Sequence, residues 1–375
     1  MRLTGLSLRR FRNLGVQDLE IPREGMALVG DNAQGKSSFL EAIYYLETFR
    51  SFRGAPDEQL VAFGEDVFRV AGTIEPGEES GATASGITAA YARKGRRKKV
   101  TVDGTEPQRL ADGLGRLAAV IFAPTDIELV SGGPIERRRF LDIVLSLGDA
   151  GYLGALQQYR QILARRNASL KARQAQSVVA AWNPGLVRSG ARVIGQRRDW
   201  VERSRAAFGS YYERISGEGG ARMSYRSSVP LADAGSIDEI ESCFRTALEG
   251  AVERERRLGA TVVGPHRDDV RLKLDGARDA LDLRTYGSGG QRRTAALALR
   301  LVEARSIRER RGSPPLVLLD DVFAELDAGR SERVLELMDS DEIGQVLVTA
   351  PKVEDVRVRA DVLPRWRIRD GRIET

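Results

Sequence analysis

The feature that most constrains the fold of this chain is a glycine-rich loop between an apolar strand and a helix. The run Met26-Ala27-Leu28-Val29 is followed by the pattern G-x-x-x-x-G-K-S and then by a helix-like stretch from 38 to 46. Glycines let the backbone curl tightly and present its N–H groups to phosphate oxygens without a Cβ in the way. The order of strand, loop and helix therefore predicts a nucleotide-phosphate site. Its eight residues are Gly30, Asp31, Asn32, Ala33, Gln34, Gly35, Lys36 and Ser37.

The last two side chains of such a loop have separate tasks. Lys36 is expected to reach the terminal phosphates, and the Ser37 hydroxyl is expected to hold Mg²⁺. The helix that follows directs the positive end of its dipole at the anion. The alternative is a glycine-rich turn that contains Lys-Ser by chance.

The composition is that of a globular chain with an excess of positive charge. Its 375 residues are 42% hydrophobic and 30% charged, with a net charge of +6 and a pI of about 9.5. This balance favours an anionic partner such as nucleic acid, although arginine enrichment also arises from genome composition. A single cysteine, Cys243, and a single histidine, His266, exclude an internal disulfide and thiolate or histidine-rich metal sites. The chain shows neither the apolar core of a signal peptide nor an apolar stretch of ~20 residues. We therefore expect a cytoplasmic protein with no membrane partner.

The chain divides into three parts by its patterns. Strands are expected at 2–10 and 26–30, and short β-prone pieces between 67 and 102 predict an antiparallel sheet. A turn-rich surface loop is expected at 75–81. After residue 258 the chain returns to alternating helix and strand, which favours a mostly parallel sheet covered on both faces. We therefore expect a split nucleotide-binding core, 1–122 and 258–375, with residues 123–257 inserted as a mainly helical subdomain.

Two helices of about 30 residues are expected in the insertion. Apolar residues recur at helical spacing from 153 to 170, and after the breaker at 183–185 a second series follows at intervals of seven. Sevenfold apolar spacing is typical of a helix that packs along a seam. The pattern predicts an antiparallel helical hairpin in a compact subdomain, and a coiled-coil arm is the alternative. The second series is Val187, Ile194, Val201, Phe208 and Ile215.

A second chemical signal lies near the C-terminus. A helix is expected from 291 to 310, and the apolar run Leu316 to Leu319 after it ends in Asp320 and Asp321. A carboxylate at the end of such a strand is the usual partner of a phosphate loop, so Asp320 is expected to bind Mg²⁺ beside Ser37. Asp321 is then the candidate catalytic acid that orients or deprotonates the attacking water. The alternative is that the paired acids only cap a helix.

The run Gly287-Ser288-Gly289-Gly290-Gln291 opens the expected helix at 291–310. Ser288 can cap that helix, and the glycines let backbone N–H groups face an anion. Alone, the run favours a capping turn. Placed some thirty residues before the apolar strand and its two acids, however, it resembles the signature loop of the ABC-type ATPases. The run Ala324-Glu325-Leu326-Asp327 is similar to the loop that those proteins use across their dimer interface.

Within that superfamily the chain resembles the RecF family of bacterial recombination mediators. The resemblance implies an α/β fold: an ABC-type ATPase head with a mixed or parallel sheet, helices and an antiparallel β subdomain, and an inserted helical subdomain. Two departures leave the hydrolysis rate open: Ser-Gly-Gly-Gln replaces the Ser-Gln-Gly-Gln usual in the family, and Thr349 occupies the place of the switch histidine of transporters. The motifs that carry the resemblance are Arg9 to Leu14, Gly30 to Ser37, Glu136 to Asp142, Gly264 to Asp269 and Leu319 to Asp327.

The resemblance implies a mechanism that composition does not show. ATP and Mg²⁺ would be held between two copies, with Lys36, Ser37 and Asp320 of one chain facing Ser288, Gly290 and Gln291 of its mate. The ATP-bound homodimer would act as a DNA clamp at single-strand gaps, and slow, DNA-stimulated hydrolysis would release it. It also implies RecO and RecR as partners in loading RecA onto single-stranded DNA.

The strongest local signal for DNA is a basic run with six positive charges in seven residues. It lies at an expected hairpin tip, where a solvated turn is the alternative to phosphate contact. Weaker candidates are Arg50, Arg53 and the triplet 137–139, which instead pairs with Glu136 and Asp142 if it is structural. No element resembles a base-reading helix, so we expect recognition of backbone and of duplex or gapped form, not of sequence. The run comprises Arg93, Lys94, Arg96, Arg97, Lys98 and Lys99.

Three other functions compete with this interpretation. The ATPase subunit of a membrane transporter is disfavoured by the missing switch histidine and the large helical insertion. An SMC-like chromosome-organising ATPase shares the same chemistry but needs arms of hundreds of residues. A DNA-binding module with a vestigial nucleotide site is disfavoured because Lys36, Ser37, Asp320 and Asp321 are all present. His266, in Gly-Pro-His-Arg, is either a general base or a structural residue.

Overall fold

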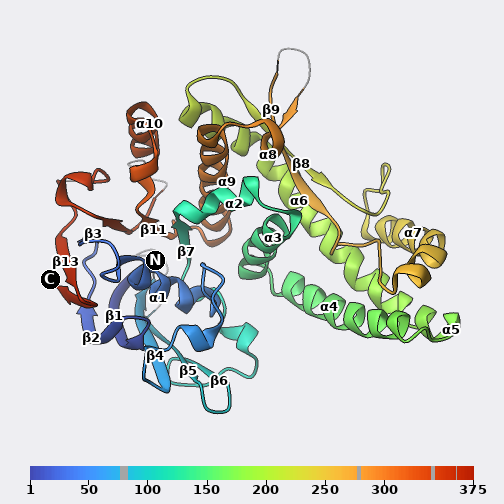
Figure 1. Ribbon diagram of the computed structural model, residues 1–375, viewed down its shortest axis with the longest axis horizontal. Coiled ribbons are helices and arrows are strands. Elements are labelled where there is room, and N and C mark those ends of the chain that lie inside the picture. The colour runs from blue at the N-terminus through green and yellow to red at the C-terminus, as the bar shows by residue number, and fades with distance from the viewer. Residues whose placement is uncertain (77–82, 277–279, 339–342, 360) are drawn as a thin grey trace. The chain divides into compact units, whose positions relative to one another are not determined.

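A computed structural model of residues 1–375 describes the whole chain except 77–82, 277–279, 339–342 and 360 (Figure 1). Most of the loop expected at 75–81 therefore lies outside the described residues. Contacts between Cα atoms divide the chain into two compact units. The first comprises 1–127, 214–217 and 296–375, and the second comprises 128–213 and 218–295.

The boundary between the units lies near the first expected position, after 122, but not near the second, after 257. The chain enters the second unit after residue 127, close to the expected position after 122. Apart from the short segment 214–217, it returns to the first unit after residue 295, rather than after 257. The difference arises because β9 (Asp269–Leu274) pairs along its whole length with β8 (Ala221–Arg226) inside the second unit. The signature run at 287–291 therefore lies with the inserted helices.

A parallel sheet forms the centre of the first unit, as expected. Its order is β14-β13-β3-β12-β11-β7, and only the pair β13–β14 is antiparallel. The strands β3, β12, β11 and β7 are buried at every position, which is typical of a sheet covered on both faces. The strands are β3 (Gly25–Val29), β7 (Ala119–Phe122), β11 (Leu316–Asp320), β12 (Val346–Ala350), β13 (Arg365–Arg369) and β14 (Arg372–Glu374).

The antiparallel sheet expected between 67 and 102 is confirmed and is larger than predicted. Its order is β2-β1-β4-β5-β6, so the N-terminal strand and its hairpin partner join it. Alternating burial along β4 shows that one face packs on the core. The strands are β1 (Arg2–Phe11), β2 (Leu14–Glu20), β4 (Val67–Glu75), β5 (Ser85–Ala92) and β6 (Arg97–Val102).

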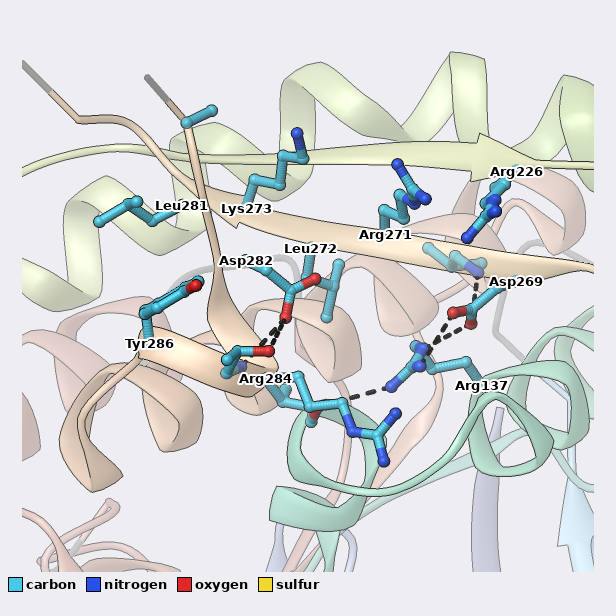
Figure 2. Close-up of a pocket in the computed structure, with 14 residues that line it drawn as sticks. Arg137, Arg226, Asp269, Arg271, Leu272, Lys273, Leu281, Asp282, Arg284 and Tyr286 are labelled. Carbon is cyan, nitrogen blue, oxygen red and sulfur yellow. Dashed lines mark hydrogen bonds and ion pairs between the residues drawn. The ribbon is translucent and has the colours of Figure 1, made fainter. Parts of the chain in front are cut away.

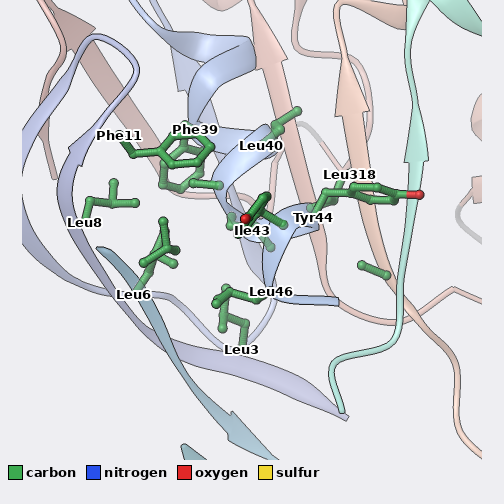
Figure 3. Close-up of a cluster of buried hydrophobic side chains, with 14 of the residues drawn as sticks. Leu3, Leu6, Leu8, Phe11, Phe39, Leu40, Ile43, Tyr44, Leu46 and Leu318 are labelled. Atoms are coloured by element: carbon green, nitrogen blue, oxygen red, sulfur yellow. The ribbon is translucent and has the colours of Figure 1, made fainter. Parts of the chain in front are cut away.

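Helix α1 (Lys36–Thr48) packs against both sheets of the first unit. Nearly all of its residues are buried, as expected for a helix that is apolar around its circumference. Figure 3 shows Phe39, Ile43 and Leu46 of α1 beside Leu3, Leu6, Leu8 and Phe11 of β1, with Leu318 of β11 nearby. The core therefore fixes the start of α1, and with it the phosphate loop, relative to the end of β11.

The second unit is mainly helical and carries a small antiparallel sheet of order β10-β9-β8, with β10 at Leu281–Asp282. All five residues of the sevenfold series are buried on one helix, which begins at Asn183 because the expected breaker forms its first turn. The expected first helix is shorter than 30 residues and is followed by a separate short helix. These helices are α2 (Glu128–Ser131), α3 (Pro134–Gly148), α4 (Ala150–Lys171), α5 (Gln176–Ala180), α6 (Asn183–Ser216), α7 (Ile237–Leu258) and α8 (Leu283–Tyr286).

Two further helices complete the architecture. Helix α9 (Gly289–Arg311) begins in the second unit and ends in the first, and it covers the helix expected at 291–310. Helix α10 (Ala328–Met338) follows the acidic strand. Short 3-10 helices lie at Asp57–Gln59, Leu110–Gly113, Pro124–Ile127, Val322–Glu325 and Val353–Asp355.

Candidate nucleotide-binding site

The glycine-rich loop joins β3 to α1 as the sequence predicts. Gly35 has a φ of +116°, a conformation that a side chain disfavours, and α1 begins directly after it. Gly30 follows β3, where a Cβ would lie 2.5 Å from the carbonyl oxygen of Ile368. Both glycines are therefore required by the backbone path. Asp31, Asn32 and Ala33 are exposed at the tip of the loop, and the Gln34 side chain accepts a hydrogen bond from the backbone N–H of Asp370.

Lys36 is buried and its ammonium group lies inside the loop. Its Nζ donates to the carbonyl oxygens of Gly30, at 2.7 Å, and of Asp31, at 3.2 Å. The side chain is only 5% exposed, so a compact positive charge is held where the loop surrounds it. This is the position from which a lysine can reach phosphate oxygens that the loop N–H groups bind.

Ser37 and Asp320 meet at the site although they are far apart in the sequence. The Ser37 hydroxyl donates to Asp320 Oδ1 at 2.8 Å. The Thr349 hydroxyl donates to the same oxygen at 3.0 Å and accepts the backbone N–H of Asp321 at 3.2 Å. Burial raises the pKa of Asp320, while the hydrogen bonds from Ser37 and Thr349 oppose that rise. Thr349 thus positions both acids.

Asp321 lies at the end of the strand in a conformation of φ +49°. Burial raises its pKa, which the positive charge of Lys36 opposes and the negative charge of Asp320 reinforces. Its side chain does not cap the following 3-10 helix, and its covered Oδ1 has no hydrogen-bond partner among the described residues. A covered carboxylate oxygen without a partner is costly unless a ligand or water satisfies it. Among the described residues, this contradicts the alternative that Asp321 is only a helix cap.

The oxygen atoms at this site fit Mg²⁺. Ser37 offers a hydroxyl and Asp320 a carboxylate, which are the hard ligands that this ion prefers. No group of three or more histidine, cysteine or acidic side chains suited to a metal occurs in the described part of the chain. Mg²⁺ is usually held by one or two protein oxygen ligands together with substrate phosphates and water, and Ser37 and Asp320 can supply such ligands.

The signature run forms the start of α9 in the second unit. The Ser288 hydroxyl accepts the backbone N–H of Gln291 at 3.2 Å, and the Gln291 side chain accepts the backbone N–H of Ser288 at 2.8 Å. This reciprocal pair is a capping box, as the capping interpretation predicts. Ser288 is also exposed, so its hydroxyl is accessible from solvent. The capping role and contact with a ligand from another copy are therefore compatible.

The basic run at 93–99 forms the tip of the β5–β6 hairpin, as predicted. Lys94, Arg97 and Arg96 are exposed. Lys98 differs, because its ammonium group lies 2.7 Å from Asp57 Oδ2, donates to the Phe49 carbonyl oxygen and lies 5.2 Å from the Tyr45 ring centroid. Lys98 therefore stabilises the hairpin base, and the exposed cations are those that can meet an anion.

The motifs at 136–142 and 264–269 are joined by buried polar contacts in the second unit. Arg137 of α3 forms a paired interaction with Asp269 at 2.8 and 3.1 Å and also donates to carbonyl oxygens of the α2–α3 turn. Asp142 accepts from Arg197 at 2.7 Å and from the Tyr152 hydroxyl at 2.5 Å. Arg137 is thus a structural residue, but its partner is Asp269 and not the expected Glu136 or Asp142.

His266 is a structural residue in the same region. Its Nδ1 lies 2.6 Å from the Tyr159 hydroxyl and its Nε2 lies 3.0 Å from the Thr261 carbonyl oxygen. Burial lowers its pKa to about 4, so the ring is neutral, accepts at Nδ1 and donates at Nε2. With both nitrogens occupied, the ring has no position from which to act as a general base.

The stabilising roles of two residues at the site, Glu41 and Thr349, were not predicted. Glu41 of α1 is fully buried and accepts from Arg12 at 2.8 and 3.0 Å, which ties the first motif to the helix that carries Lys36. The sequence signal for Glu41 was a single acidic residue, four positions after Ser37, within the apolar stretch 39–46. The role of Thr349 has no local signal, because its partners Asp320 and Asp321 lie at and just after the end of the neighbouring strand β11.

The described helices offer no span that is both long and apolar enough to cross a bilayer.

Comparison with known proteins gives concordant matches over nearly the whole chain. The family model described as the RecF/RecN/SMC N terminal domain matches residues 2–371. The DNA replication and repair protein RecF of Synechococcus sp. (strain JA-3-3Ab) is 38% identical over 356 residues, covering 93% of this chain and 91% of that protein. The protein of the same name from Geobacter sp. (strain M21) is 36% identical over 377 residues, covering 100% of both.

Solved structures agree with these sequence matches. A structure of the recombination mediator protein RecF-ATPrS in the RecFOR pathway is 32% identical, with a TM-score of 0.89 over 100% of this chain and 97% of that one. An Smc head domain from Pyrococcus furiosus is 17% identical with a TM-score of 0.59, covering 99% of this chain and 95% of that chain, and it supports the fold alone. The α/β ABC-type head expected from the sequence is thereby confirmed.

Proposed function

This chain belongs to the RecF family of DNA replication and repair proteins, and from that premise we propose that it is an ATP-dependent DNA clamp. The observation that carries the proposal is the hydrogen bond of 2.8 Å between the Ser37 hydroxyl and Asp320. The next residue in the chain, Asp321, has a covered carboxylate oxygen with no hydrogen-bond partner among the described residues. A phosphate loop, a metal-binding acid and an available second acid are the parts that nucleotide hydrolysis requires.

Each residue of the site has a task in this proposal. The N–H groups of the loop from Gly30 to Gly35 bind phosphate oxygens, and Lys36 neutralises the terminal phosphates. Ser37 and Asp320 hold Mg²⁺, which supplies charge neutralisation for the phosphates when bound. Asp321 orients the attacking water, and its carboxylate oxygen without a hydrogen-bond partner among the described residues is available to accept a proton.

The site is completed by a second copy of the chain. Ser288, Gly290 and Gln291 of the partner contact the nucleotide, so ATP binds only the closed dimer fully and stabilises it by mass action. Hydrolysis removes that stabilisation and releases the clamp. The exposed cations of the β5–β6 hairpin contact DNA phosphates without reading sequence.

In the cell, the clamp acts at single-strand gaps and, with RecO and RecR, promotes RecA loading. The alternative is an SMC-like chromosome-organising ATPase without long arms. The longest helix in the described part of the chain is α6, of 34 residues, or about 50 Å at 1.5 Å per residue. The length of α6 favours the DNA clamp over the SMC-like ATPase, because a helix of about 50 Å is too short to bridge distant DNA segments.

The proposal predicts that nucleotide controls the molar mass. Light scattering should give 41.2 kDa without nucleotide and twice that value with a slowly hydrolysed ATP analogue and Mg²⁺. Ser288→Arg, at an exposed position, should bind the analogue yet remain a monomer because the longer side chain blocks the partner's phosphates. Lys36→Ala should lose nucleotide binding itself.

Nucleotide binding measured separately provides the control. A mass that stays at 41.2 kDa while the analogue binds would show that Ser288 only caps α9, and the clamp mechanism would then be rejected.

A further inference from the structure

A cavity of about 460 Å³ lies in the second unit, and none of the residues assigned to nucleotide lines it (Figure 2). It is bordered by β8, β9, β10 and α8, by Val130 of α2 and by Arg137 of α3. Ligand sites in proteins commonly enclose roughly 300–1,000 Å³, so this cavity is large enough for one nucleotide unit.

The cavity carries an excess of positive charge that the described residues do not neutralise. Five cations line it. Arg137 is paired with Asp269, whereas Arg226, Arg271, Lys273 and Arg284 form no ion pair within the described ranges. Its two acids are engaged elsewhere. Asp269 is paired with Arg137, and Asp282 accepts the backbone N–H and hydroxyl of Thr285. The cavity therefore suits an anion with more than one negative group.

The pairing of β8 with β9 arranges these cations in a row. Arg271 and Lys273 are two residues apart on β9, so they share one face and lie about 7 Å apart. Arg226 lies on the neighbouring strand, opposite Asp269, and Figure 2 shows the three cations in succession along the strands. The intervening residues Val270 and Leu272 are buried. The spacing is comparable with that of successive phosphates along one polynucleotide strand.

An exposed aromatic ring borders the same cavity. Tyr286 is 67% exposed, and Leu281 beside it is 45% exposed. An aromatic side chain next to a cationic groove is the combination on which proteins stack unpaired bases while binding the phosphates. A duplex does not offer this contact, because its base faces are covered by their neighbours.

We propose that this cavity binds a segment of single-stranded DNA. Arg226, Arg271 and Lys273 contact successive phosphates, and Tyr286 stacks on a base. The proposal rests on the proposed DNA-binding function and adds to it a surface that selects unpaired strands, separate from the hairpin at 93–99. It would provide a physical means of recognising the single-stranded side of a gap.

The test compares single-stranded and duplex binding by the full chain. Fluorescence anisotropy with labelled oligothymidylate should show that Arg271→Gln/Lys273→Gln reduces the salt slope of log K by about 1.4, since each neutralised phosphate contributes about 0.7 in single strands. Tyr286→Ala should weaken single-strand binding roughly 5- to 150-fold. Neither change should alter duplex affinity or the ATP-dependent doubling of mass.

Arg188→Gln/Arg192→Gln, at exposed positions of α6, is the matched control that removes the same charge from the same unit. The proposal is overturned if the cavity variants bind oligothymidylate as the unaltered protein does, or if the control loses as much affinity. It is also overturned if the cavity variants fail to dimerise, which would assign the cavity to the subunit interface. An unaltered protein that binds duplex but no single strand rejects this proposal alone, and one that binds neither rejects the proposed function as well.

Discussion

At the residue scale, the site depends on a few hydrogen bonds that orient charged groups before any ligand arrives. Thr349 donates to Asp320 and accepts from the backbone of Asp321, so one hydroxyl sets the positions of both acids. Asp320 also accepts from Ser37. Fixed dipoles of this kind reduce the reorganisation that a charged ligand would otherwise require.

His266 gives a prediction at the same scale. Its pKa is about 4 in the folded protein, against about 6.5 in an unfolded chain. Below pH 6.5 the unfolded state therefore binds a proton that the folded state does not, so stability is lost as the pH falls toward 4. The loss should reach up to about 3 kcal/mol for this residue.

Urea unfolding of the unaltered protein and of His266→Gln between pH 7 and pH 4 measures this contribution. Carboxylate titration is common to both proteins, so the difference isolates the histidine. Parallel stability curves would show that burial of His266 does not depress its protonation.

At the element scale, the β5–β6 hairpin separates structural from available charge. Lys98 is held by Asp57 and Phe49 at the hairpin base, while Lys94 and Arg97 are exposed. The hairpin thus presents cations on a strand pair that the antiparallel register holds in place.

Lys94→Glu/Arg97→Glu should therefore weaken duplex binding and reduce the salt slope of log K by about 0.9 for each phosphate that the hairpin no longer neutralises. Binding of a fluorescent duplex across a range of salt concentrations measures both quantities. Arg188→Glu/Arg192→Glu is the control for net charge. Equal losses of affinity in the two variants would indicate a general electrostatic effect and would place the duplex surface elsewhere.

At the scale of the whole molecule, the proposed cycle couples one acid to the oligomeric state. Asp321→Asn keeps the size of the side chain but removes the base, so hydrolysis should slow by about 10²- to 10⁴-fold. The ATP dimer should then persist after mixing, whereas the unaltered dimer should dissociate as ATP is consumed. Time-resolved light scattering with ATP and Mg²⁺ follows both proteins, and unchanged turnover would remove Asp321 from the catalytic role.

Most local features could be predicted from the sequence. The strand–loop–helix order around Lys36, the buried strand before Asp320 and the sevenfold series on α6 all depend on short-range backbone geometry and on periodic burial. These constraints act within one or two turns of chain, so residue order alone contains them. The family motifs extended this prediction to the fold, which the solved RecF structures confirm.

What only the tertiary structure decided involves partners distant in the sequence. The pairing of β8 with β9 placed the signature run in the second unit, matched Arg137 with Asp269 and lined up the cations of the cavity. Likewise, Lys98 is indistinguishable from its neighbours until the hairpin folds over Asp57. The sequence by itself determined which chemistry the chain carries. Long-range strand pairing determined which charges are neutralised and which are available, because neutralisation depends on distance in space and not along the chain.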